Sequence, residues 1–176
     1  MKIINRISSI FDRISHDIRL TNIKPSLILA SITLFLGIFS WIAGGRPDKV
    51  TLLYIFPRCA ISLTIMYLLW AVYFICIGFT IGGITFGCEK FKKREAVKST
   101  TLLIISFMCT LSVYALFFIC LSPLITFLVL LVSAFFTFLA LMTCAKIYSL
   151  WTICIVIHLI WILYNSYIAI IITLIN

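Results

Sequence analysis

The chain has 176 residues, of which 64% are hydrophobic and only 11% are charged, and its formal net charge is +9. A soluble domain of this size does not carry so much apolar surface, so the composition excludes that class and indicates an integral membrane protein. The positive charge does not indicate nucleic-acid binding, because the basic residues lie mostly between apolar runs, where membrane topology accounts for them.

Residues 1–24 form an arm ahead of the first apolar run. Within residues 3–20, isoleucine and phenylalanine recur at spacings of three and four residues, and charged or polar side chains fill the opposite face. This spacing predicts an amphipathic helix that lies flat on the cytoplasmic surface of the membrane. Two interpretations stay open, namely an anchor or partner-binding arm and a solubilised extension with no further role.

Residues 25–176 contain five apolar runs, each long enough to approach or exceed the roughly 20 residues that cross a bilayer as a helix. The runs are continuous, whereas the strands of a membrane barrel alternate between apolar and polar residues. The predicted spans are 26–44, 59–87, 99–121, 124–144 and 148–174. The sequence therefore predicts an all-α integral membrane protein, a five-transmembrane-helix bundle with an N-terminal amphipathic helix.

The basic residues also predict an orientation. Eleven of the 14 Lys and Arg residues lie in the arm, in the segment 88–98 and at Lys146, and the other three lie between the first two spans. The positive-inside rule then places the N-terminus in the cytoplasm and the C-terminus outside, in what we expect to be the plasma membrane of a bacterium. No internal repeat is visible, which argues against the inverted-repeat plan of many transporters.

Few chemically reactive groups occur inside the spans. No Asp or Glu follows Glu95, and a carrier coupled to protons or sodium usually needs ionisable groups in the membrane. The seven cysteines are scattered and only two histidines exist, so neither a metal site nor a disulfide framework is expected. Phosphate-binding and nucleophile motifs are missing as well. We assign no catalytic residue, no metal and no cofactor.

Two aromatic stripes remain as a candidate site. In the last span His158 and Trp161 share one helical stripe, and Tyr164 lies beside it. In the second span Trp70 occurs among further rings, Tyr67, Tyr73 and Phe74. Such stripes suit a pocket for a flat apolar ligand with few polar contacts. The alternative is that the rings only fill the bundle or mark the membrane interface.

These residues resemble the TspO/translocator-protein family, the tryptophan-rich sensory proteins. In the last helix of that family a Trp is followed by Tyr or Phe and later by Asn, and Trp161, Tyr164 and Asn176 sit at those offsets. The likeness covers about residues 27–176. Further matching positions are Gly37, Ser40, Pro57, Trp70, Gly78, Phe117, Phe118, Ser122 and Pro123.

On this comparison the chain resembles a divergent member of the family. Thr64 stands where the family has a second pocket Trp, and Ile157 and His158 replace its Pro-Tyr pair. No basic residue follows Lys146, so the cholesterol-recognition pattern of the animal proteins is missing.

The resemblance implies a membrane sensor or regulator that binds a flat hydrophobic ligand, such as a porphyrin, between its helices. Tyr54 and Pro57 in the first loop would help to form a lid over the pocket. The resemblance also implies a homodimer, contact with membrane lipid and a weak light-dependent degradation of porphyrin. The ligand-binding residues that it implies are Trp161, Tyr164, Trp70, Tyr54, Pro57 and His158.

Two other functions stay open. The chain suits a non-catalytic accessory or scaffold protein, in which the arm and the basic segment 88–98 recruit a partner or anionic lipid. It also suits a small uncoupled carrier or channel.

Overall fold

The computed structural model describes residues 2–44, 55–57, 60–87, 93–114, 116–117 and 122–176. Within these residues the chain is helical, without strands, and five of the helices are long and apolar enough to cross a membrane. The predicted five-helix membrane bundle with an N-terminal amphipathic helix is confirmed. The helices are α1 (Lys2–Leu20), α2 (Ile23–Gly44), α4 (Leu63–Phe86), α5 (Lys93–Tyr114), α6 (Pro123–Cys144) and α7 (Ser149–Ile175).

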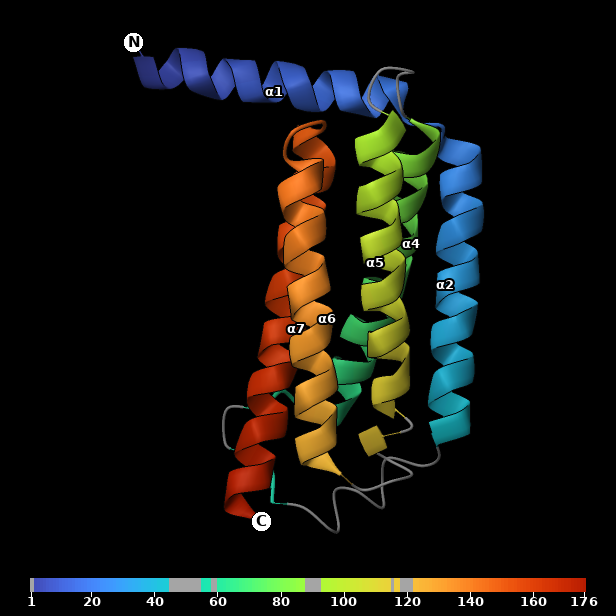
Figure 1. The fold of residues 1–176 in the computed structure, drawn as a ribbon, viewed down its shortest axis with the longest axis vertical. Coiled ribbons are helices and arrows are strands. Elements are labelled where there is room, and N and C mark those ends of the chain that lie inside the picture. The colour runs from blue at the N-terminus through green and yellow to red at the C-terminus, as the bar shows by residue number, and fades with distance from the viewer. Residues whose placement is uncertain (1, 45–54, 58–59, 88–92, 115, 118–121) are drawn as a thin grey trace.

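The five spanning helices run side by side, and α1 lies crosswise over one end of the bundle (Figure 1). Helix α2 packs on α4, α4 on α7, α7 on α6 and α6 on α5, and α5 returns to contact α2 and α4. The two ends of the chain lie at opposite ends of the bundle, as an odd number of crossings requires (Figure 1). Helix α2 alone has 22 residues, enough to span about 33 Å.

The helices bury their contacts inside the bundle and present apolar side chains outward. Phe74 of α4, Leu103 of α5 and Ile155 of α7 belong to the main buried cluster. Large side chains such as Phe35 and Ile160 are exposed on the outer surface. An apolar exterior of this kind matches lipid, so packing and hydrogen bonds, not exclusion of water, hold the spanning helices together.

Glycines bring α2 and α4 into backbone contact. A Cβ atom on Gly78 would lie 2.6 Å from the carbonyl oxygen of Leu29, and one on Gly82 would lie 2.5 Å from Cα of Ser26. At the same contact Oγ1 of Thr33 donates a hydrogen bond to the carbonyl oxygen of Phe74 at 2.7 Å. Small residues allow two membrane helices to approach this closely.

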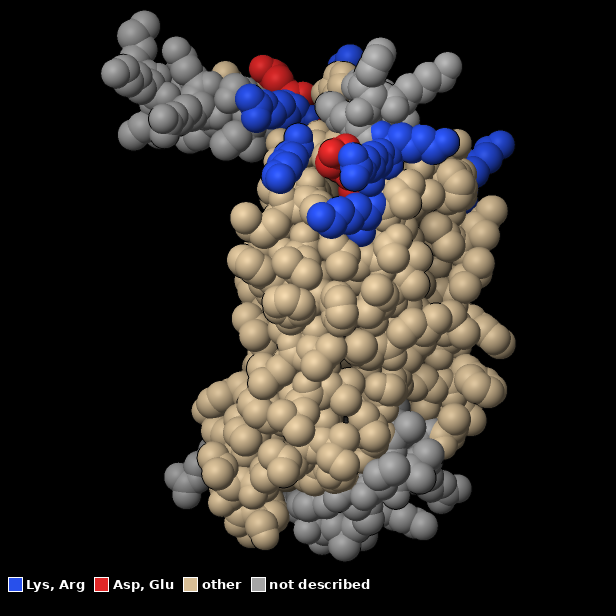
Figure 2. All heavy atoms as spheres, viewed as in Figure 1, with Lys and Arg blue, Asp and Glu red and all other residues tan. Residues whose placement is uncertain are grey.

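Charged side chains gather at the end of the bundle that carries α1 (Figure 2). Below this end, the described parts of the spans carry no Asp, Glu, Lys or Arg. The charged residues at this end whose side chains the structure describes are Asp12, Arg13, Asp17, Arg19, Lys24, Lys93, Arg94, Glu95, Lys98 and Lys146.

The starts of α5 and α4 differ most from the predicted starts of the spans. Helix α5 begins at Lys93 instead of residue 99, so half of the charged segment is helical. Lys, Arg, Glu and Ala are all good helix formers, and Glu95 lies in the first turn, where a negative charge is favourable. Helix α4 begins at Leu63 instead of residue 59, after Ser62 at the N-cap. Apolar content alone does not locate such ends.

A carboxylate joins α1 to α7. Oδ2 of Asp17 accepts hydrogen bonds from the backbone N–H groups of Ser149 at 2.8 Å and Leu150 at 3.0 Å. The first N–H groups of a helix have no partner within it, and a negative charge at this end complements the helix dipole. Asp17 is only 6% exposed, although it belongs to a helix on the surface of the bundle. The arm therefore caps the last spanning helix.

Replacing Asp17 with alanine should weaken this docking. We expect a loss of about 1 kcal/mol, the usual effect of removing a helix cap, and faster hydrogen exchange at the amides of Ser149 and Leu150. Exchange measured by mass spectrometry in detergent would report both. Asp12→Ala is the matched control, because Asp12 is exposed on the same helix. Equal exchange in the two variants would show that the cap does not hold α1.

Candidate functional site

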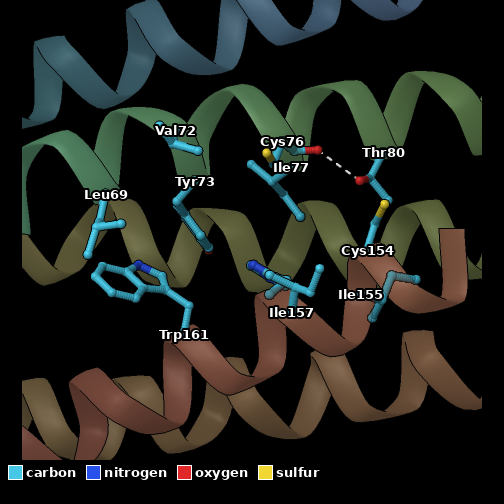
Figure 3. A pocket seen from close by; sticks show the side chains of 11 residues that line it. Leu69, Val72, Tyr73, Cys76, Ile77, Thr80, Cys154, Ile155, Ile157 and Trp161 are labelled. Carbon is cyan, nitrogen blue, oxygen red and sulfur yellow. Dashed lines mark hydrogen bonds between the residues drawn. The ribbon is translucent and has the colours of Figure 1, made fainter.

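A groove between α4 and α7 holds a cavity of about 150 Å³. Val72 and Ile157 at its edges are exposed on the outer surface, so the groove opens toward lipid, whereas Ile77 and His158 are buried. Leu69 and Tyr73 project from α4 toward α7, and Trp161 projects back from α7 (Figure 3). The lining residues are Leu69, Val72, Tyr73, Cys76, Ile77, Thr80, Cys154, Ile155, Ile157, His158 and Trp161.

Ring contacts join the two helices at this groove. The rings of Tyr73 and His158 are stacked, with centroids 4.9 Å apart. The indoles of Trp70 and Trp161 meet edge to face at 5.6 Å, a geometry that aromatic pairs favour. The ring of Tyr164 stacks on the indole of Trp161, with centroids 5.7 Å apart. Trp161, which lines the groove, is therefore held between the rings of Trp70 and Tyr164.

The predicted ligand-binding residues fall into different places. His158 and Trp161 line the groove. Trp70 is buried and supports Trp161, and it lines a second cavity, between α2 and α4, of about 190 Å³. Tyr54 lies outside the described residues. The assignment of these residues to ligand binding stays a prediction.

The other predicted residues lie where the second half of α7 meets the stretch around Pro57. The hydroxyl oxygen of Tyr164 accepts a hydrogen bond from the backbone N–H of Ile61 at 3.1 Å. The side chain of Asn176 accepts from the N–H of Ile55 at 2.9 Å and donates to its carbonyl oxygen at 3.3 Å. These bonds fix the residues on either side of Pro57 against α7. Neither Pro57 nor Tyr164 lines the groove.

A cluster of buried hydroxyl groups behind the groove was not predicted. Oγ of Ser106 lies 2.8 Å from Oγ of Ser133, 2.7 Å from Oγ1 of Thr137 and 3.4 Å from Nε2 of His158. The cluster joins α5, α6 and α7 at membrane depth, where polar side chains need partners inside the protein. Serine and threonine in the middle of apolar spans were the signal that could have revealed it.

The α4 wall of the groove was also missed in part. Tyr73, Cys76 and Thr80 follow Leu69 at spacings of three or four residues and so share one helical face. The small polar residues Cys76 and Thr80 continue the helical face of Tyr73, and including them in the predicted aromatic face would have identified this wall. In the described part of the chain, no three His, Cys, Asp or Glu residues come together as a metal site would require.

Comparisons with known proteins give this site no assignment. No protein-family model matches the chain, and no curated protein matches its sequence. The groove is therefore interpreted from its own geometry.

Proposed function

We propose that the protein binds a small, flat, apolar ligand in the groove between α4 and α7, and that it acts as a membrane sensor or regulator of the TspO type. The observation that carries the proposal is an aromatic-walled cavity at membrane depth, lined by Trp161 and Tyr73 and open to lipid beside Val72 and Ile157. Ligand sites are commonly apolar and aromatic, with a few placed polar groups.

The size of the cavity limits the size of the ligand that it can hold. Pockets for drug-sized molecules are about 300–1,000 Å³, whereas the groove holds about 150 Å³, a volume comparable to that of cavities that bind benzene. A single aromatic ring therefore fits the groove as it stands. A tetrapyrrole, the ligand that the family resemblance implies, would require α4 and α7 to move apart.

Filling the groove should abolish binding. We expect bromobenzene, whose bromine quenches indole fluorescence on contact, to quench the purified protein in detergent with a saturable curve. Cys76→Phe places a ring into the groove and should remove the saturable component. Ile75→Phe is the matched control, because both side chains are exposed on α4 but only Cys76 lines the groove.

Non-saturating quenching that is equal in all three proteins would contradict the proposal. Quenching by bromobenzene would then reflect its partition into the micelle. Saturable quenching in the wild type and in both variants would place the binding elsewhere, for instance in the cavity beside Trp41 and Trp70.

A second candidate function rests on the charged end of the bundle. Basic side chains lie there with α1, which Asp17 fixes across the end (Figure 2). Arg13 and Lys146 border one hollow together with Asp17. We propose that this end faces the cytoplasm and binds anionic lipid headgroups, as basic segments beside spanning helices do. In this scaffold function the groove has no ligand, so the quenching experiment separates the two candidates.

A further inference from the structure

A hollow of about 480 Å³ lies between α1 and the turn that joins α6 to α7. Whereas the groove between α4 and α7 is apolar, this hollow is bordered by five ionisable side chains, those of Asp12, Arg13, His16, Asp17 and Lys146. It lies at the end of the bundle where charged side chains gather (Figure 2). Charged residues at the ends of spanning helices lie at the level of the lipid headgroups.

The basic side chains of the hollow have no ionic partner, whereas its buried carboxylate is already engaged. Oδ2 of Asp17 accepts hydrogen bonds from the backbone N–H groups of Ser149 and Leu150. Neither Arg13 nor Lys146 makes an ion pair with a described residue, and both side chains are exposed. Two positive charges beside one hollow therefore remain available to an anion from outside the chain.

The donors at this hollow suit a phosphate group. Arg13 and His16 are three residues apart on α1 and share one side of that helix, and Lys146 belongs to the turn on the other wall. Guanidinium and ammonium groups are the usual partners of phosphate, and both side chains are long enough to turn toward one anion. Asp12 also borders the hollow, and its exposed carboxylate opposes an anion.

An exposed apolar face continues from the hollow along α7. Ser149 borders the hollow, and Ile153 and Ile157 follow at intervals of four residues, on the same face of the helix. The two isoleucines are 45% and 62% exposed. At the rise of an α-helix, Ile157 lies about 12 Å further along the axis than Ser149. A soluble anion leaves this face uncovered, whereas an acyl chain attached to the phosphate covers it.

We infer that the hollow binds the phosphate of an anionic phospholipid, and that an acyl chain of this lipid lies along the face of α7 from Ser149 to Ile157. The inference rests on the second candidate function, the binding of anionic headgroups at the charged end. It goes further because it assigns the headgroup to one site, with Arg13 and Lys146 as the phosphate-binding residues and Asp12 as a residue that weakens binding.

The test titrates the full chain in detergent with dioleoylphosphatidylglycerol and measures bound lipid by native mass spectrometry. Dioleoylglycerol, which has the same chains and no phosphate, should bind much more weakly. Arg13→Gln and Lys146→Gln should each weaken binding of the phospholipid about five-fold, the effect of one basic residue near a membrane surface. Asp12→Asn should strengthen it, because it removes a negative charge beside the phosphate.

Arg19→Gln and Lys98→Gln are the matched controls. Arg19 lies on the same helix as Arg13, and Lys98 lies in the second turn of α5; both are exposed, and neither borders the hollow. Each should change the affinity by less than about two-fold, because exposed charges at a distance are screened by salt. Circular dichroism should show the same helical content in all five variants.

Equal weakening by Arg13→Gln and Arg19→Gln would overturn the inference and leave the second candidate function standing, because the lipid would then bind the charged end without a defined site. Inorganic phosphate that binds as tightly as the phospholipid would indicate a site for a soluble anion, which also overturns the inference. If dioleoylglycerol binds as tightly as the phospholipid, and no charge substitution has an effect, the second candidate function fails as well.

Discussion

Replacing Gly78 with valine should separate α2 from α4 and unfold much of the bundle. A Cβ atom at this position would lie 2.1 Å from Oγ1 of Thr33, 2.6 Å from the carbonyl oxygen of Leu29 and 2.7 Å from Cα of Ala30. Two of these atoms belong to the backbone, so no side-chain rotation relieves the overlap. The separation would also break the hydrogen bond from Thr33 to Phe74. We expect a loss of about 3 kcal/mol or more, at the upper end of overpacking effects.

The measurement is the midpoint of unfolding in a series of detergent mixtures, followed by circular dichroism. Ile75→Val on the same helix is the control, because Ile75 is exposed toward lipid. Its midpoint should stay close to that of the wild type. A Gly78→Val protein with an unchanged midpoint would show that α2 and α4 are not in backbone contact.

Replacing Ser106 with alanine should cost about 1–2 kcal/mol, since it removes the shared partner of two hydroxyl groups and of Nε2 of His158. Single hydrogen bonds between membrane helices average about 0.6 kcal/mol, and the larger value is expected because several contacts meet on one atom. The free energy of unfolding in mixed micelles measures this loss.

Ser112→Ala is the matched control for Ser106→Ala. It is the same substitution on the same helix, but Ser112 is exposed and donates to the carbonyl oxygen of Cys109 within α5. We expect less than about 0.5 kcal/mol for it. Equal losses in the two variants would mean that the cluster contributes nothing beyond local helix propensity.

The number of spans and the type of the arm were predictable because they follow from the length of apolar runs and from three- and four-residue spacing. The order of the helices around the bundle was not, since it depends on which faces fit together. Gly78 and Gly82 mark a face of α4 for close contact, but nothing local identifies α2 as its partner. Apolar content places the first turn of α5 outside the predicted span, although its charged residues are good helix formers.

The candidate site was predictable only within one helix. The spacing of His158 and Trp161 places them on one face, and the structure shows both beside the groove. Their contacts with Tyr73 and Trp70 depend on how α4 meets α7, which no local pattern contains. The same holds for the partners of Ser106, which come from two other helices.

The cap that Asp17 places on α7 also determines when α1 can dock during synthesis of the protein. Its partner amide at Ser149 lies 132 residues later in the chain. At ordinary rates of synthesis, the arm leaves the ribosome roughly 7–26 seconds before that amide exists. During this interval the arm has no cap to complete, so it must wait at the membrane surface until the last helix has been inserted. Docking of α1 is thus a late event in biogenesis, and it reports that the whole bundle is in place.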